Sequence, residues 1–252
     1  MKAIANYESA AKEIVNWTRE TVESNGTKDA VIILNGDRDS AIVANILVKA
    51  LGEDHVLGLI MPFEPSMDCS KTYMIARQVG MKKLKEVDIT LTTQAAECTT
   101  KIACDNEDIL WVTSADIIPR TRTLLAQTIA SQINAVVIST LNLSDYTIGN
   151  FTLWSNVGML APLGKLTSTE VAELGKALGL PDEIVEMQQY EDAYGQTSES
   201  KIGFKYADLD MWIRGGDDIP EGVKKVIEDR FSKCSHKCKL INMPAFHPAI
   251  IQ

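Results

Sequence analysis

The chain has 252 residues, 45% hydrophobic and 23% charged, as expected of a globular protein long enough to bury a substantial core. Its 34 acidic and 25 basic residues give a net charge of −9, which argues against nucleic acid as a partner because an acidic surface repels phosphate backbones. No run approaches the roughly 20 apolar residues that span a bilayer. The N-terminal segment also lacks the apolar centre of a secretory signal, so we expect a cytoplasmic protein with no membrane segment.

Helix-like and strand-like segments alternate as far as Thr140. Helical patterns cover residues 7–23, 40–51, 71–79 and 117–132, and apolar runs typical of strands cover 30–34, 55–61, 84–87 and 135–140. The segment 40–51 is apolar on nearly all sides, so this helix should be buried. Pro119 should lie in the first turn of the helix at 117–132, where a missing N–H costs little. The alternation predicts an α/β fold, a parallel sheet with helices on both faces.

Beyond Thr140 the alternation weakens. Residues 141–168 are rich in Asn, Ser, Thr and Gly, which is typical of a functional loop region. Helical patterns follow at 169–178 and 223–232. Because there is no repeat and no convincing linker, we expect a single domain over residues 1–252.

The five cysteines are an odd number, which suits a reducing compartment better than a disulfide framework. Cys234, His236 and Cys238 lie close together in the sequence and could be zinc ligands. The alternative is a pair of free thiols near a helix end, since no second pair of ligands accompanies them.

The turn between the first expected strand and the next helix contains the most informative residues. Leu34 ends the strand and is followed by Asn35, Gly36, Asp37, Arg38, Asp39 and Ser40. A helix N-terminus presents free N–H groups and positive potential to an anion, so such a turn can bind phosphate. It is neither a Walker A loop nor a dinucleotide-binding G-x-G-x-x-G turn. An alternative interpretation is an Asp-containing turn with Ser40 as the helix N-cap.

This turn resembles the S-G-G-x-D-S loop of ATP pyrophosphatases, which it matches at Gly36, Asp39 and Ser40. Further matches follow in the same order as in the ammonia-dependent NAD synthetases and lie at residues 61–62, 116–122, 139–145, 162–171, 195–199, 203–210 and 236–237. Agreement by chance at so many separate places in the same order is implausible. The sequence therefore resembles that family over most of its length, which implies an adenine nucleotide alpha-hydrolase-like fold.

The resemblance implies a reaction in which ATP adenylates deamido-NAD, pyrophosphate leaves, and ammonia displaces AMP to give NAD. It implies an ATP site at Leu34, Asn35, Gly36, Asp37, Arg38, Asp39, Ser40, Met61 and Thr140. It also implies contacts to deamido-NAD from Arg120, Asn142, His236 and Lys237, and Mg²⁺ ligands at Asp39 and Asp145. No protein nucleophile is expected, so catalysis would consist of positioning and electrostatic stabilisation. A homodimer is implied, with the helix at 117–132 near its interface.

Several positions depart from the family pattern. Asp37 replaces a glycine, and a carboxylate about 4 Å from a phosphate charge would cost on the order of 4 kcal/mol at an effective dielectric near 20. Arg38 would relieve part of this cost by pairing with Asp37 or with the phosphate. Two lysines are replaced by Leu143 and Ser168, and the family's aspartates are missing from residues 154–160. The remaining departures are Asn35, Ser198 and Cys238.

These departures leave three hypotheses. The first is a divergent NAD synthetase. The second is a catalytically impaired paralogue that serves as a nucleotide-binding or dimeric scaffold. The third is an enzyme that activates a different carboxylate or carbonyl, which Arg120, His236 and Lys237 argue against because they match the deamido-NAD side of the site.

Overall fold

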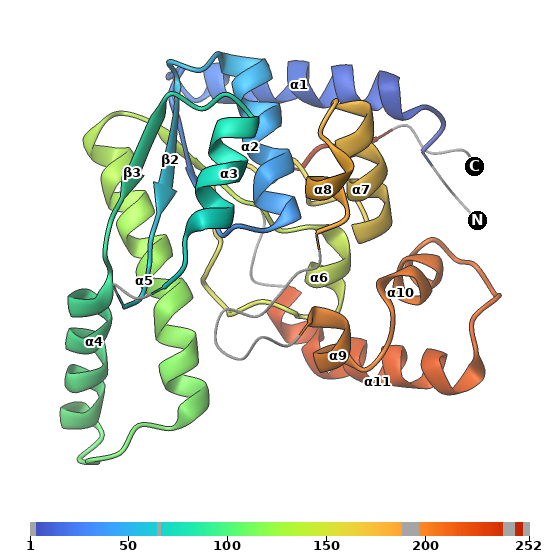
Figure 1. The fold of residues 1–252 in the computed structure, drawn as a ribbon. Helices are drawn as coiled ribbons and strands as arrows, with labels where there is room; N and C mark the ends of the chain where they lie inside the picture. The colour runs from blue at the N-terminus through green and yellow to red at the C-terminus, as the bar shows by residue number, and fades with distance from the viewer. Residues whose placement is uncertain (1–3, 65–66, 188–196, 239–244, 249–252) are drawn as a thin grey trace.

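The computed structural model describes residues 4–64, 67–187, 197–238 and 245–248 (Figure 1). Its elements in chain order are α1 (Tyr7–Ser24), β1 (Ala30–Ile33), α2 (Arg38–Leu51), β2 (Val56–Ile60), α3 (Ser70–Gln78), β3 (Lys83–Glu86), α4 (Thr90–Ala103), α5 (Trp111–Gln132), β4 (Val136–Ile138), α6 (Leu143–Thr147), α7 (Ser168–Ala177), α8 (Asp182–Val185), α9 (Ser198–Ile202), α10 (Tyr206–Ile213) and α11 (Glu221–Cys238). Within these residues, no helix is both long and apolar enough to cross a membrane.

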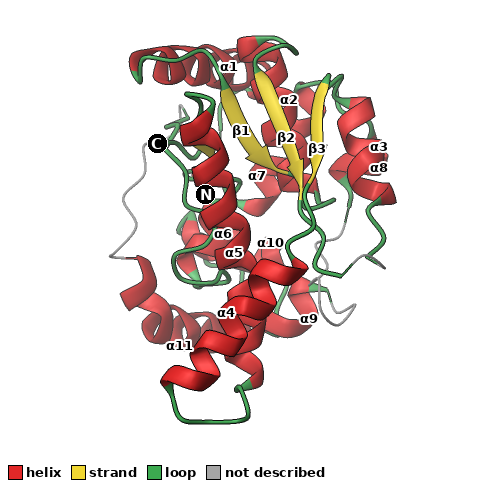
Figure 2. Cartoon of the chain, turned by 90° about the vertical axis from the view of Figure 1, so that its left-hand side faces the viewer, coloured by secondary structure: helices red, strands yellow, loops and turns green. Residues whose placement is uncertain are grey.

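The four strands form one parallel sheet in the order β3-β2-β1-β4, and Figure 2 shows β1, β2 and β3 side by side. Ala30 of β1 lies opposite Val56 on one side and Val136 on the other. The central strand is apolar and buried because helices cover both faces of a parallel sheet, whereas the edge strand β3 carries lysines and a glutamate. Since β1 and β4 are neighbours, the loops that follow them begin at the same edge.

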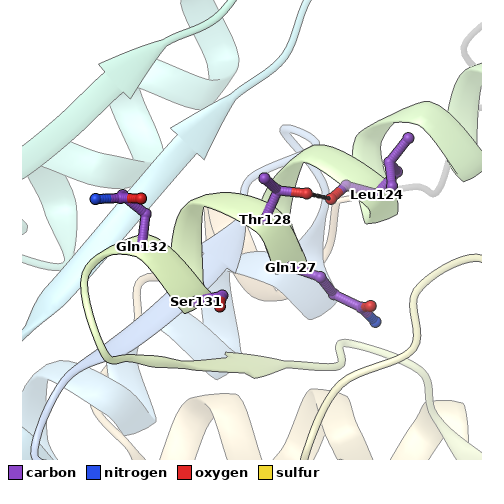
Figure 3. A pocket seen from close by; sticks show the side chains of 5 residues that line it. All are labelled: Leu124, Gln127, Thr128, Ser131 and Gln132. Atoms are coloured by element: carbon purple, nitrogen blue, oxygen red, sulfur yellow. Dashed lines mark hydrogen bonds between the residues drawn. The ribbon is translucent and has the colours of Figure 1, made fainter.

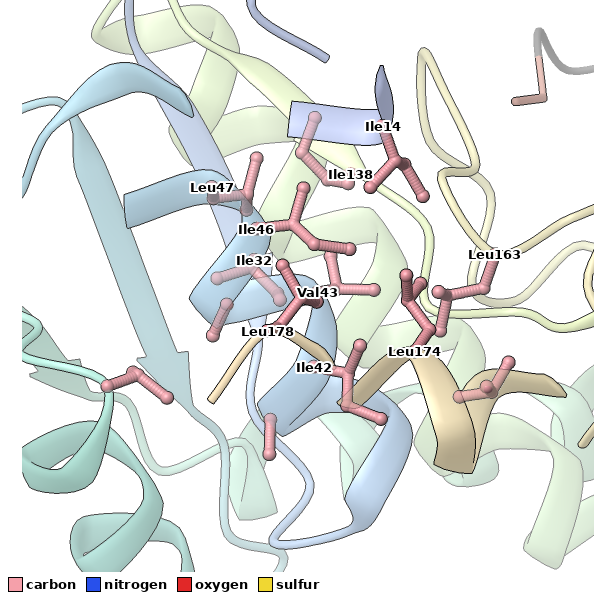
Figure 4. Packing of buried hydrophobic residues seen from close by; sticks show 14 of the residues in the cluster. Ile14, Ile32, Ile42, Val43, Ile46, Leu47, Ile138, Leu163, Leu174 and Leu178 are labelled. Atoms are coloured by element: carbon pink, nitrogen blue, oxygen red, sulfur yellow. The ribbon is translucent and has the colours of Figure 1, made fainter. Parts of the chain in front are cut away.

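Two apolar layers flank the sheet. On one face α2 packs against β1 and β2, and α1 and α7 pack against α2. Figure 4 shows Ile42, Val43 and Ile46 of α2 pointing into this layer beside Ile32 and Leu174. On the other face α5 packs against β1 and β4. The predicted α/β class, with helices on both faces and a buried second helix, is confirmed.

The other elements extend beyond the sheet. α4 and α5 pack against each other and project past its edge as a pair (Figure 1). Away from the sheet, α10 and α11 pack against α6 and surround a small apolar cluster that includes Ile148, Leu209 and Ile227.

The prediction for Pro119 is wrong. The helix begins at Trp111 instead of residue 117, so Pro119 lies inside it. There the proline ring removes one intrahelical hydrogen bond. Packing of α5 against α4 and the sheet supports the helix through this position, and the pattern of α5 alone does not reveal those contacts.

Gly158 lets the chain run directly beside the end of β4. The Met159 amide donates to the Val137 carbonyl at 2.7 Å, and the Ser139 amide donates to the Leu160 carbonyl at 2.9 Å. A Cβ atom on Gly158 would lie 2.6 Å from the Ser139 nitrogen, a distance at which the backbone would have to move. Glycine is therefore required here, and it places the preceding residues against the carboxyl end of β4.

Candidate active site

The β1–α2 turn is held by its own side chains. Gly36 has a φ of 76°, and a Cβ atom there would lie 2.9 Å from Thr72 Oγ1, so both conformation and space require glycine. Asp37 is the N-cap of α2, because its Oδ1 accepts a hydrogen bond from the Ser40 amide at 2.7 Å. The alternative assignment of Ser40 as the N-cap is therefore wrong. The Ser40 hydroxyl instead donates to the Asp37 carbonyl at 3.1 Å, inside the first turn.

A pair of buried carboxylates lies where the loops after β1 and β4 meet. Asp39 belongs to the first turn of α2, and Asp145 belongs to the first turn of α6. The Nδ2 atom of Asn142 donates to Oδ2 of Asp39 at 2.6 Å and to Oδ2 of Asp145 at 2.8 Å. Asn142 is also the N-cap of α6, where its Oδ1 accepts from the Asp145 amide at 2.9 Å. One asparagine thus fixes both predicted metal ligands.

Asp145 is the most perturbed acid of the pair. Burial, followed by the nearby charge of Asp39, raises its pKa to about 6, against the hydrogen bonds that favour its ionised form. Those bonds come from Asn142, from Asn150 at 2.9 Å and from the Tyr206 hydroxyl. Burial, and then Asp145 itself, raises the pKa of Tyr206, which therefore stays protonated as a donor. The two carboxylates carry more negative charge than the neutral hydrogen-bond donors around them offset.

Arg38 supplies a positive charge to this pair. Its Nε atom lies 3.0 Å from Asp39 Oδ1, and its Nη2 atom donates to Ser168 Oγ at 2.8 Å. Ser168 is the first residue of α7, a helix whose N-terminus is fixed by a capping box between Thr167 and Glu170. The hydrogen bond from Arg38 to Ser168 therefore connects the first turns of α2 and α7.

A second buried carboxylate network supports α6 and α7. The Ser144 hydroxyl donates to Asp210, and the Thr169 amide donates to Asp210 Oδ2 at 2.7 Å. The Ser168 amide donates to Ser144 Oγ at 2.9 Å. Burial raises the pKa of Asp210, while these hydrogen bonds lower it. Asp210 and Tyr206 match the family pattern in sequence, but sequence analysis gave them no role.

Met61 and Thr140 follow β2 and β4 at the same edge of the sheet. Met61 is buried, and its carbonyl accepts from Arg122 Nε at 3.0 Å. The backbone amide of Thr140 donates to Asn156 Oδ1 at 3.0 Å, and Asn156 Nδ2 donates to its hydroxyl at 3.0 Å. Neither Arg122 nor Asn156 was a predicted site residue, because their contacts depend on the folded positions of α5 and of the segment beside β4.

The residues expected to bind deamido-NAD do not form one cluster. Arg120 Nε donates to the Leu153 carbonyl at 3.1 Å, and Lys237 Nζ donates to the Phe151 carbonyl at 2.9 Å. Both cations thus hold the segment 149–153. His236 is exposed, and its Nδ1 contacts the Lys233 carbonyl of its own helix at 3.0 Å. Among the described contacts, none joins His236 to the carboxylate pair.

Two other features lie apart from the carboxylate pair. A hollow of about 500 Å³ is lined by Leu124, Gln127, Thr128, Ser131 and Gln132 of α5 alone (Figure 3). The described residues contain no group of three or more His, Cys, Asp or Glu side chains placed to hold a metal ion. This does not decide the zinc hypothesis, because the Cys238 side chain lies outside the described residues, as do Gly195 and Gln196 of the matched pattern.

An open parallel sheet with acidic and amide side chains at its carboxyl edge is the arrangement of nucleotide-binding α/β proteins. A family model described as NAD synthase matches residues 10–241. An NH(3)-dependent NAD(+) synthetase of Carboxydothermus hydrogenoformans is 33% identical over 242 residues, covering 95% of this chain and 98% of that protein. One from Archaeoglobus fulgidus is 34% identical over 217 residues, covering 83% and 84%. The chain belongs to the NAD synthase family.

Solved structures agree on the fold. An NMN synthetase from Francisella tularensis superposes with a TM-score of 0.83 at 24% identity, covering 96% of this chain and 99% of that one. An NH3-dependent NAD synthetase from Campylobacter jejuni superposes with a TM-score of 0.75 at 20% identity, covering 94% and 99%.

The raised pKa of Asp145 predicts a pH-dependent stability. An unfolded aspartate has a pKa near 3.9, below the folded value of about 6. The folded state therefore binds more protons between about pH 4 and 6, and the free energy of unfolding should fall as pH rises through that window, by an amount on the order of 2 kcal/mol. Asp145→Asn should reduce this fall in urea denaturation series with EDTA. Asp229→Asn, at an exposed ion pair of α11, is the control, and equal slopes in wild type and Asp145→Asn would contradict the assignment.

Proposed function

We propose that this protein is an NAD synthetase, a carbon–nitrogen ligase that uses ATP and ammonia to convert deamido-NAD to NAD through an adenylated intermediate, releasing AMP and pyrophosphate. The main support is the family match over residues 10–241. The curated relatives described above are named for this ammonia-dependent reaction. The carboxylate pair at the carboxyl edge of the sheet supports the same function.

We place ATP at the β1–α2 turn, between Met61 on one side and Thr140 on the other. Ser40 and the first turn of α2 face the phosphates in this arrangement, and Gly36 allows the backbone to approach them. Arg120, Asn142, His236 and Lys237 remain the proposed contacts to deamido-NAD. For Arg120 and Lys237 this requires release or sharing of the carbonyls that they now hold.

Asp39 and Asp145 fit a magnesium ion. Both offer only carboxylate oxygens, the ligands that Mg²⁺ prefers, and burial, followed by the charge of Asp39, raises the pKa of Asp145. When bound, Mg²⁺ would offset the charge of the phosphates and of the departing pyrophosphate. Asn142 holds both carboxylates in place, and Tyr206 and Asn150 fix the second of them. These residues act by positioning and charge, so no protein nucleophile is needed.

The impaired-paralogue hypothesis is not favoured. Its strongest support is the loss of charge at Leu143 and Ser168 and the extra acid at Asp37. Against it, Asp39, Asn142 and Asp145 are present and linked by hydrogen bonds of 2.6 and 2.8 Å. A scaffold has no need of two buried carboxylates held together, because their combined charge exceeds the single positive charge that Arg38 supplies and the excess costs stability.

The direct test is titration calorimetry with ATP and Mg²⁺, then with deamido-NAD, followed by assays for NAD and pyrophosphate. We expect saturable ATP binding and NAD formation that requires ammonia. Nicotinate mononucleotide is assayed in parallel, because one structural neighbour is an NMN synthetase. ATP binding without amidation of deamido-NAD or of nicotinate mononucleotide would contradict the synthetase proposal and leave the scaffold hypothesis.

The acid at position 37 should limit ATP affinity. Asp37 Oδ1 occupies the amide of Ser40, a donor that a phosphate would otherwise take. We expect Asp37→Gly to lower the KM for ATP about tenfold or more, since a like charge is removed, while the cap loss costs only a few tenths of a kcal/mol.

Asp37→Asn is the matched variant, because it keeps the capping oxygen and removes the charge. If charge limits binding, both variants improve it. If close approach limits binding, only glycine does. Steady-state kinetics on purified variants makes the comparison, and no gain from either would contradict this role of Asp37.

We also propose a homodimer formed through α4 and α5. This pair exposes several large apolar side chains, namely Leu91, Ile102, Leu110, Trp111, Val112 and Leu124. Leu91 is 81% exposed and Leu110 is 75% exposed, and a second copy of the chain packed on these helices would bury such side chains.

Sedimentation of Trp111→Glu and Leu124→Glu tests the homodimer. Both variants should weaken dimerisation by a factor of about 100 or more, because each buries a charge in an apolar contact. Val226→Glu, at an exposed apolar position of α11, should not change it. Unaltered dimers in both α5 variants would place the interface elsewhere.

A further inference from the structure

Arg38 is a nearly buried cation in the implied ATP site, and the sequence leaves open whether it pairs with Asp37 or with the phosphate. Its side chain is 12% exposed and lies between Asp39 Oδ1, 3.0 Å from Nε, and Ser168 Oγ, 2.8 Å from Nη2. Two anchors on different helices hold the guanidinium in one place. This fixed orientation distinguishes Arg38 from a solvated surface arginine.

One edge of this guanidinium remains available. Within the described part of the chain, the hydrogen bonds of Arg38 use Nε and Nη2, and Nη1 makes none. Nη1 is also absent from the buried polar atoms that lack a partner, so it reaches the surface of the site. A planar fork with free N–H donors matches the geometry of phosphate oxygens.

Helix N-termini favour an anion at this edge, whereas the nearest carboxylates, Asp37, Asp39 and Asp145, oppose one. The first turns of α2 and α7 meet at Arg38, and helix N-termini favour negative ligands. Asp37 and Asp39 belong to the same turn and would repel a phosphate. The family pattern has a lysine at position 168. Ser168 carries no charge, but its hydroxyl accepts a hydrogen bond from Arg38 of α2 and so holds that cation in place.

We propose that Arg38 is a phosphate-binding residue of this site, whose Nη1 contacts the oxygens of the two ATP phosphates that leave as pyrophosphate. The inference rests on the proposed function, because it concerns the same ATP site. Arg38 thus provides from α2 the positive charge that is missing at position 168. A purely structural role, neutralising Asp39, is the alternative that the test must separate.

The test compares binding of inorganic pyrophosphate with Mg²⁺ and of AMP, by titration calorimetry on the full chain. Arg38→Met should weaken pyrophosphate binding by about 10- to 100-fold, the loss of a charge-assisted contact, and should change AMP binding less than about twofold. Arg38→Lys should weaken pyrophosphate binding less than Arg38→Met does. In the double variant Arg38→Met with Ser168→Lys, a cation returned from α7 should recover a large part of the pyrophosphate affinity.

Arg19→Met is the matched control. Its guanidinium donates to the Ala50 carbonyl at 2.6 Å, at the opposite end of α2, so pyrophosphate binding should stay at the wild-type level. In kinetics, Arg38→Met should raise the KM for ATP and leave the KM for ammonia unchanged.

Unchanged pyrophosphate affinity in Arg38→Met would overturn the inference, and so would an equal loss of AMP and pyrophosphate binding together with lower thermal stability. Either result could occur while the wild type still makes NAD, which would leave the proposed function intact. Conversely, a wild type that binds pyrophosphate through Arg38 but makes no NAD would support the inference and refute the synthetase proposal.

Discussion

The site depends on one amide group that holds two acids. The Nδ2 atom of Asn142 is shared between Asp39 and Asp145, which come from helices following two different strands. Two carboxylates in a poorly solvated place repel each other, and this shared donor offsets part of the repulsion by bonding both. The neighbouring order of β1 and β4 in the sheet makes the arrangement possible, because their carboxyl ends lie side by side.

Several other polar groups of the site also have partners within the chain. Asp37 takes the N-terminal amide of α2, and Lys237 holds the segment 149–153 through backbone carbonyls. A ligand must therefore exchange existing hydrogen bonds for new ones, and the net gain of such an exchange is small compared with the strength of each bond. Affinity in this site thus depends on the charge balance more than on the number of donors.

Sequence patterns predicted the strands and α2 well, because a continuous apolar run flanked by turn residues is compatible with few other secondary structures. They missed α4 and the early start of α5, two segments that contact each other in the fold. The family resemblance placed Asp39, Asn142 and Asp145 in the site. It assigned Asn142 to the substrate, which stays a proposal, and it did not predict that the Asn142 amide donates hydrogen bonds to both acids.

The contact between Arg38 and Ser168 could not be predicted from sequence, because it joins residues 130 positions apart. Read separately, Asp37 and Ser168 are two departures from the family pattern that would weaken phosphate binding, and Arg38 fills a position at which the pattern allows any residue. In space they are neighbours: Asp37 and Arg38 are adjacent in the first turn of α2, and the Arg38 guanidinium touches Ser168. Effects of residues in one charge network are not additive. The effects of the acid at 37 and of the missing cation at 168 on phosphate binding must therefore be judged together with Arg38, which lies between them. The positive charge of Arg38 opposes both effects.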